Sequence, residues 1–471
     1  MSSRTLVRGA LALALCIAND VHAASDADLA AIRDEIRQLK ESYEARIRAL
    51  EERLQNGEVA VSRAPETTAA PTPPAAAAAP IAPVAAASAM PPAASGIAAF
   101  NPAISAVLQG AYINLSQDPN RYAIAGFAPS GDIGPGPRSF SLAESELTLS
   151  ASVDHSFAAA LTFSLTPENT VSVEEAYGIA TDLPYGLTPK FGRFFSGIGY
   201  LNEQHQHNWD FYDAPLVYQA FLGGQYTNNG VQLKWVAPTD TFVEFGGELG
   251  SGYGYPGNER NKNGIGDGTV YVHAGGDLGA SSSWRAGLSY LQTAAKDREY
   301  TQADIAGNDA NVSFSGRSQV AIADFVWKWA PNGNAMDRNF KFQTEYFWRR
   351  ERGDLAYDSN GAPGLSQTGD YRSTQSGFYA QAVWQFMPSW RVGARYDWLD
   401  PGTVDYGATG AYFAESSFNP QRTSVMFDYT PSEFSRFRLQ YTQSKVQPGL
   451  TDNQIFLQYI LTLGAHGAHR Y

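Results

Sequence analysis

From residue 104 almost to the C-terminus, the sequence repeats short segments in which apolar and polar residues alternate. Residues 391–398 show the pattern, because Val392, Ala394, Tyr396 and Trp398 alternate with charged residues and glycine. Successive side chains of a β-strand point to opposite faces of its sheet. One face of each segment therefore meets an apolar surrounding, and the other meets water. Because the pattern recurs along most of the chain, we expect an all-β barrel with lipid outside and a polar interior.

Sixteen segments carry this pattern, and tight turns between them alternate with long connections. Bacterial transmembrane barrels have an even number of strands, short periplasmic turns and longer external loops. The sequence therefore predicts a sixteen-stranded antiparallel transmembrane barrel over residues 100–471, with residues 196–224 as its third external loop. The predicted strands cover residues 104–115, 141–153, 158–166, 171–180, 187–195, 231–237, 242–250, 269–278, 283–293, 319–329, 340–350, 377–386, 391–399, 423–430, 436–444 and 453–463. The other long connections are expected at residues 116–138, 251–267, 294–318, 351–375 and 400–421.

The first residues have the features of a secretory signal. Arg4 and Arg8 precede a short apolar run, and small residues follow it near Ala23. This order of a basic start, an apolar core and a small-residue cleavage site predicts a signal peptide over residues 1–23. The single cysteine, Cys16, lies within that signal, so the mature chain is expected to contain no disulfide.

A helical pattern precedes the barrel. Over residues 26–55, apolar residues recur at spacings of three and four with charged residues between them, which predicts a periplasmic coiled coil. Residues 57–98 are rich in proline and alanine and are expected to form an extended linker. The alternative to a coiled coil over residues 26–55 is a single amphipathic helix on the peptidoglycan side of the membrane. An Arg-apolar-x-x-apolar-Glu motif favours a homotrimer over a dimer, and its residues are Arg46, Ile47, Leu50 and Glu51.

Composition excludes several functions. The formal net charge of −13 argues against a nucleic-acid partner, which would require basic patches. No nucleophile motif accompanies a histidine, and His205 with Asp210 is the only pair that resembles catalytic machinery. We therefore expect a protein that is not an enzyme, located in the outer membrane of a Gram-negative bacterium.

Residues 201–216 read LNEQHQHNWDFYDAPL and carry the densest group of candidate functional side chains. Imidazole together with carboxylate suits zinc and neighbouring transition metals, so His205, His207 and Asp210 form a candidate metal site. Two alternatives remain: the polar groups anchor the loop to the barrel wall, or they bind passing cations transiently. The predicted constriction and selectivity residues are Glu203, His205, His207, Asp210 and Asp213.

Charges predicted to face the interior are unevenly distributed. Acidic residues come from the early strands and most basic residues from the later ones. Such a lumen would hold an electric field across the pore. The alternative is that opposite charges pair within the wall and only stabilise a polar interior. The acidic residues are Glu144, Glu146, Glu174, Glu244 and Glu248; the basic ones are Lys341, Arg349, Arg391, Arg395, Arg436 and Arg438, with Asp324, Glu345, Asp397 and Asp428 between them.

This arrangement resembles the trimeric sixteen-stranded porins, in which the third loop folds into the lumen and narrows it. The coiled coil ahead of the barrel is similar to that of the phosphate-selective porin group. The closest resemblance is to proteins labelled zinc-regulated outer-membrane receptors, which implies a link to metals. It is carried by Asn101-Pro102-Ala103-Ile104, Ser145-Glu146-Leu147, Gly192-Arg193-Phe194 and Leu201-Asn202-Glu203-Gln204-His205.

The sequence also departs from energy-coupled receptors, which carry a large plug domain ahead of the barrel. Here only a coiled coil and a linker separate the signal from the first strand. We therefore expect a passive channel for small hydrophilic solutes, with a lean toward cations or divalent metals and no required cofactor. The alternatives are a receptor-like, energy-coupled importer of zinc or another metal, and a structural tether between outer membrane and peptidoglycan.

Overall fold

A computed structural model describes residues 102–128, 133–167, 169–257, 263–359, 367–413 and 415–464. The predicted signal peptide, coiled coil and linker, including the trimer motif, lie outside these residues. In the described part of the chain, no helix is both long and apolar enough to cross a membrane.

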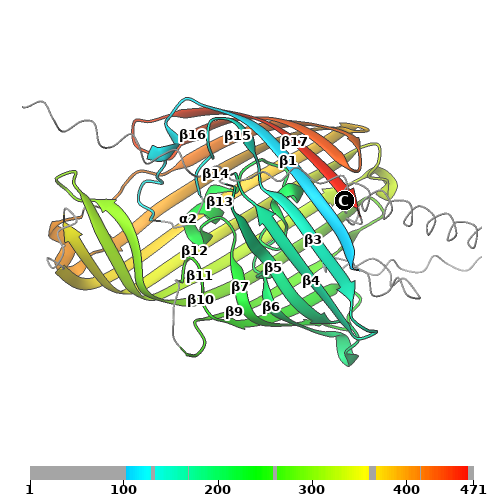
Figure 1. Ribbon diagram of the computed structural model, residues 1–471, viewed down its shortest axis with the longest axis horizontal. Coiled ribbons are helices and arrows are strands. Elements are labelled where there is room, and N and C mark those ends of the chain that lie inside the picture. The colour runs from blue at the N-terminus through cyan, green and yellow to red at the C-terminus, as the bar shows by residue number, and fades with distance from the viewer. Residues whose placement is uncertain are drawn as a thin grey trace, which may run out of the picture. The chain divides into compact units, whose positions relative to one another are not determined.

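The described residues form one antiparallel sheet that closes on itself (Figure 1). Neighbouring strands in the sequence are neighbours in the sheet, and the first strand pairs with the last to complete the barrel. The strands are β1 Ala103–Leu115, β2 Ser139–Leu142, β3 Ser145–Ser152, β4 Phe157–Leu165, β5 Val171–Ala180, β6 Leu187–Phe195, β7 Thr227–Val236, β8 Phe242–Gly250, β9 Asp267–Leu278, β10 Ser282–Ala303, β11 Asp309–Trp329, β12 Asn339–Ser359, β13 Gln367–Met387, β14 Trp390–Asp405, β15 Gln421–Ser432, β16 Ser435–Lys445 and β17 Asp452–Gly464.

The strands β2 and β3 occupy a single position in the wall. Both pair with β1: β2 along Gly110–Ile113 and β3 along Ala103–Val107. The predicted strand over residues 141–153 is thus interrupted at Ala143 and Glu144. Counted by wall positions, the barrel has sixteen strands, which confirms the predicted all-β, sixteen-stranded antiparallel barrel.

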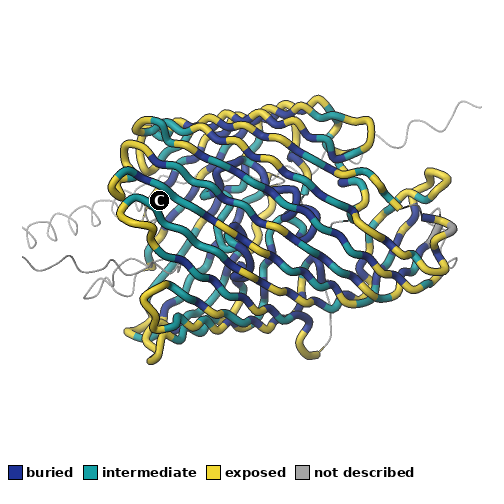
Figure 2. The backbone as a smooth tube through the Cα atoms, turned by 180° about the vertical axis from the view of Figure 1, so that it is seen from behind, coloured by how far each residue is buried: buried dark blue, intermediate teal, exposed yellow. Residues whose placement is uncertain are grey.

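The predicted alternation is present along the wall. On β17, Ile455 and Leu457 are exposed on the outside, whereas Gln454 and Gln458 are buried toward the interior. Figure 2 shows the same alternation of exposed and buried positions along many strands. An apolar exterior is the surface that a bilayer accepts, and closing the sheet leaves no open edge of unpaired backbone groups in the lipid.

The strands β10 to β13 are longer than predicted. Each has 21 or 22 residues, about twice the 9–11 that cross a bilayer. Most of residues 294–318 and 351–375, predicted as loops, are therefore strand, and that prediction was wrong. Charged residues such as Lys296 and Glu299 interrupt the apolar face here. A strand that extends beyond the lipid meets water outside, while its inner face stays apolar through residues such as Phe314 and Leu355.

The segment between β6 and β7 folds into the barrel (Figure 1). Its helix α2, Leu216–Leu222, contacts β12, β13 and β14 and is buried at every residue. Apolar side chains of α2 pack against wall residues such as Phe347 and Leu399, which gives the barrel a hydrophobic core of its own. This is the inward course that the resemblance to porins implied for the third external loop.

Candidate functional site

We refer to residues 196–226 as the inward segment. Its first turn is held by Glu345, a fully buried carboxylate on β12. Glu345 accepts the backbone N–H groups of Tyr200 and Leu201, both at 3.1 Å, and the hydroxyls of Tyr218 at 2.9 Å and Tyr379 at 2.7 Å. Gly199 has a φ of 65°, and a Cβ at this position would lie 2.2 Å from Oε2 of Glu345. Only glycine therefore allows the backbone to come this close to the carboxylate.

We expect Glu345→Gln to loosen the start of the inward segment. The amide nitrogen of glutamine is a donor, so it cannot accept the hydrogen bonds that the second carboxylate oxygen now receives. Leaving buried donors unpaired costs about 1–3 kcal/mol each. Hydrogen–deuterium exchange should show faster exchange across residues 196–226. The control is Glu299→Gln, at an exposed position on β10, and it should exchange like the unchanged protein. Equal protection of residues 196–226 in both variants would contradict the role of Glu345 in holding this segment.

The middle of the inward segment presents two histidines to the acidic side of the barrel. Nδ1 of His207 lies 2.8 Å from Glu146, and Nδ1 of His205 lies 3.0 Å from the other oxygen of the same carboxylate. His205 also contacts Glu174 at 3.2 Å and, through Nε2, Glu175 at 3.0 Å. The two rings stack with centroids 5.6 Å apart. Three carboxylates from β3 and β5 therefore converge on two imidazoles.

A β-bulge explains how two consecutive glutamates reach one histidine. On β5, Glu175 pairs with Thr162 and Val173 pairs with Phe163, so Glu174 has no partner on β4. An extra residue in one strand changes the local direction of its side chains. Simple alternation placed only Glu174 inside the barrel, and Glu175 was missed for this reason.

The protonation of His205 follows from these contacts. Burial disfavours the charged imidazole, but the carboxylates of Glu146 and Glu174 outweigh burial and raise the pKa of His205 well above its ordinary value. As an imidazolium, His205 can donate from both ring nitrogens to the carboxylates that face them. The contacts therefore hold the inward segment to the acidic wall.

The next part of the inward segment presents two aspartates to the basic side. Asp210 forms ion pairs with Lys341 on β12 and with Arg391 on β14. Asp213 lies 2.9 Å from Arg395 on β14 and 2.5 Å from Arg422 on β15.

The guanidinium groups also bind the backbone of the inward segment. Arg395 donates to the carbonyl of Asp213 at 2.8 Å, and Arg438 donates to that of Trp209 at 2.9 Å. Arg436 donates to the carbonyl of His207 at 3.3 Å. Wall aspartates share these cations, since Asp397 contacts Arg395 at 3.0 Å and Asp428 contacts Arg438 at 2.9 Å. Opposite charges thus pair both within the wall and between the wall and the inward segment.

Three of the remaining predicted acids, Glu203, Glu244 and Glu248, lie near β7 and β8. Glu203 pairs with Lys234 at 2.5 Å. Glu244 contacts Lys234 at 3.8 Å and His273 at 3.2 Å. Glu248 accepts the backbone N–H of Gly197 at 2.8 Å. Glu144, between β2 and β3, accepts a hydrogen bond from the hydroxyl of Ser164.

The acidic and basic residues of the predicted interior set lie on different strands of the sheet. Glu146, Glu244 and Glu248 lie on β3 and β8, whereas Arg391, Arg395, Arg436 and Arg438 lie on β14 and β16. Sequence reasoning missed Lys234 and Arg422. Arg422 could have been found by extending the alternation of β15 backward by two residues from Ser424.

The set of possible metal donors differs from the predicted one. Donor atoms of Glu146, His205 and His207 lie within 4.8 Å of one another. The carboxylate of Asp210 instead lies against Lys341 and Arg391. Ligand atoms of zinc lie about 2.0–2.2 Å from the ion, so two ligands of one ion can be at most about 4.4 Å apart. Two imidazoles and a carboxylate fit the chemistry of zinc, but their donor atoms would have to move slightly closer together around an ion. Each coordinating nitrogen would also have to give up its proton to solvent.

Comparisons with known proteins find a similar sequence and similar solved structures. No family model matches the chain. An uncharacterized protein of Aquifex aeolicus (strain VF5) is 28% identical over 401 residues, which cover 79% of this chain and 80% of that protein. Among solved structures, the trimer form of OmpT from Vibrio cholerae is similar, with a TM-score of 0.46 and 11% identity over 76% of this chain and 98% of that one. The outer membrane channel DcaP of Acinetobacter baumannii has a TM-score of 0.45 and 11% identity over 76% of this chain and 96% of that one.

Proposed function

We propose that the protein is an outer-membrane channel for passive diffusion of small hydrophilic solutes, narrowed by the inward segment. The observation that carries this proposal is the course of residues 196–226, which cross the interior of a closed barrel and bind both of its charged arcs. A barrel that served only as a scaffold would not need a polar interior with a separate element inside it. Loop-narrowed barrels admit solutes by size and charge.

We propose further that the channel favours cations on its acidic side. Around His205 and His207, carboxylates outnumber imidazoles, because Glu146, Glu174 and Glu175 all contact these rings. On the basic side, aspartates of the wall and of the inward segment compensate much of the positive charge. A cation that passes the histidines therefore meets excess negative charge, and a divalent metal could pause between Glu146, His205 and His207.

The homotrimer, the peptidoglycan contact of the coiled coil and the link to zinc-regulated receptors remain part of this proposal. The homotrimer and the peptidoglycan contact rest on the pattern of residues 26–55, which lie outside the described structure. The link to zinc-regulated receptors rests on the resemblance carried by motifs between residues 101 and 205. An energy-coupled importer of zinc would use the same histidines, but it would not admit unrelated solutes. Native mass spectrometry of the full chain tests the trimer, which a monomeric or dimeric mass would exclude.

Liposome swelling tests passive diffusion directly. Liposomes containing the folded protein should swell in isotonic pentose faster than in hexose, and faster in hexose than in a trisaccharide. The same liposomes with heat-denatured protein serve as the control. Swelling rates that equal this control for every solute would exclude a passive channel and leave the energy-coupled importer.

A further inference from the structure

The first long connection of the barrel also contributes to its interior. It joins β1 to β2 at the end of the barrel where the inward segment enters, and its residues 121–127 reach α2. We refer to these residues as the first-loop segment. Ile124 is 1% exposed and belongs to the same hydrophobic cluster as α2. The interior therefore holds two separate segments that contact each other.

Side chains of the first-loop segment contact α2 at two positions. The hydroxyl of Tyr122 donates to Oε1 of Gln219 at 2.7 Å. The ring of Phe127 packs edge-on against Phe221, with centroids 5.5 Å apart. Such edge-to-face pairs stabilise a contact beyond the apolar area that they bury. Because α2 also contacts β12, β13 and β14, the helix is enclosed between the wall and the first-loop segment.

The wall holds the first-loop segment through its backbone. Gln375 on β13 donates to the carbonyl of Gly126 at 2.7 Å, and the N–H of Ala125 donates to the carbonyl of Val446, next to β16, at 2.9 Å. A Cβ at Gly126 would lie 2.6 Å from Cβ of Pro401, so glycine lets the segment lie directly against β14. Three parts of the wall thus fix the position of the first-loop segment against α2.

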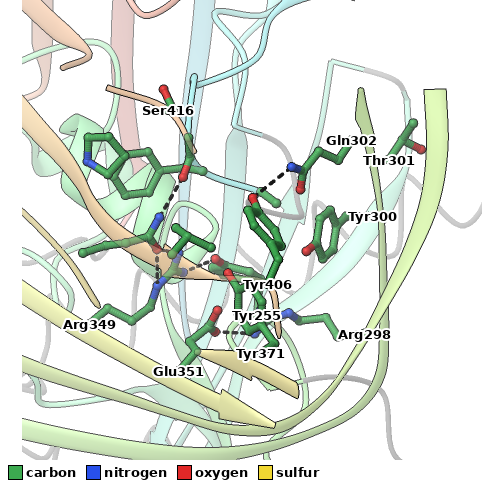
Figure 3. Close-up of a pocket in the computed structure, with 16 residues that line it drawn as sticks. Tyr255, Arg298, Tyr300, Thr301, Gln302, Arg349, Glu351, Tyr371, Tyr406 and Ser416 are labelled. Carbon is green, nitrogen blue, oxygen red and sulfur yellow. Dashed lines mark hydrogen bonds and ion pairs between the residues drawn. The ribbon is translucent and has the colours of Figure 1, made fainter. Parts of the chain in front are cut away.

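A small cavity lies beside the first-loop segment (Figure 3). Phe127 lines it together with Tyr255 and Arg349, and both of these donate to the carbonyl of Ala220 in α2 at 3.2 Å. Other lining residues come from the projecting strands β10, β12 and β13, and the volume is about 140 Å³. A cavity of about 150 Å³ holds benzene, which is smaller than a hexose. A sugar therefore does not fit in this cavity while these contacts persist.

We propose that the first-loop segment is a second constriction element, which sets the size limit of the channel together with the inward segment. This inference rests on the proposed function of the protein as a passive channel. The segment acts in two ways, because it occupies interior space itself and holds α2 against the wall. Loss of its contacts with α2 should therefore admit larger solutes.

The variant Ile124→Asp tests this role, because burying an unpartnered carboxyl group among apolar side chains is strongly unfavourable. The first-loop segment should then leave α2, while the wall strands, which pair without it, stay folded. In liposome swelling, we expect the rate for a trisaccharide relative to that for a pentose to rise severalfold. Hydrogen–deuterium exchange should become faster at residues 216–222, which form α2.

The matched control is Ile305→Asp, which makes the same change at a side chain that is 65% exposed in the connection between β10 and β11. It should leave the swelling ratio and the exchange of α2 unchanged. Phe127→Ala removes the ring contact with Phe221 without introducing a charge, so it stays informative if Ile124→Asp does not fold. It should also raise the relative rate for the trisaccharide.

Two negative results have different meanings. Folded Ile124→Asp and Phe127→Ala proteins that keep the swelling ratio of the unchanged protein would overturn the role of the first-loop segment. If the unchanged protein admits none of the solutes, the proposed function fails, and the size limit fails with it. The unchanged protein therefore distinguishes failure of the channel from failure of the second constriction.

Discussion

Replacing Asp213 with alanine should loosen the inward segment from the basic wall and widen the channel. Asp213 is the shared counter-ion of Arg395 and Arg422, whose side chains are 1% and 3% exposed. Removing one partner of a buried ion pair costs about 3–5 kcal/mol. We expect the lower end of this range, because Asp397 still contacts both guanidinium groups.

Three readouts follow for the Asp213→Ala variant. Single-channel conductance should rise severalfold, and the urea midpoint of unfolding should fall. The reversal potential should shift toward anions, because two guanidinium groups lose one of their two counter-ions. Asp240→Ala, at an exposed position in the turn between β7 and β8, is the control and should leave all three unchanged. Unaltered conductance in a folded Asp213→Ala protein would show that the inward segment does not narrow the channel.

Removing both histidines should weaken the proposed binding of zinc. In the variant His205→Ala/His207→Ala, only Glu146 remains of the three donor residues that lie within 4.8 Å of one another. We expect the zinc concentration for half-saturation to rise by at least about 100-fold, since losing even an outer-shell partner of a metal costs about 10–100-fold. Isothermal titration calorimetry in detergent measures the affinity, and block of the channel current by zinc measures its effect.

The matched control is His155→Ala/His273→Ala. His273 is buried beside Glu244, as His207 is beside Glu146, but it is outside the group of metal donors. This control should keep the zinc affinity of the unchanged protein. Equal zinc binding by both double variants would mean that the histidines only anchor the inward segment.

The wall of the barrel could be predicted from local alternation. The predicted bounds of β5, β6 and β8 match the structure to the residue, although a bulge interrupts the alternation within β5. The ends of β10 to β13 could not be predicted in this way. Beyond the lipid the outer face meets water, and alternation of hydrophobicity no longer distinguishes the two faces.

The candidate site could be predicted only in part. The sequence showed which residues of 201–216 carry imidazole and carboxylate, because they are close together in the chain. It could not show that Glu146 would contact His205 and His207, since these residues lie on different elements whose relative position depends on the whole barrel. The bulge that turns Glu175 inward depends on pairing with β4, and the partners of Asp210 depend on β12 and β14.

Single-channel recording in planar bilayers, with different KCl concentrations on the two sides, tests the central claim most directly. Folded protein should insert in discrete steps of current, and the current through each channel should be proportional to voltage. The reversal potential should have the sign expected when cations carry most of the current. Protein denatured before addition is the control and should give no steps. Folded protein that inserts without conducting would contradict a channel narrowed, but not closed, by the inward segment.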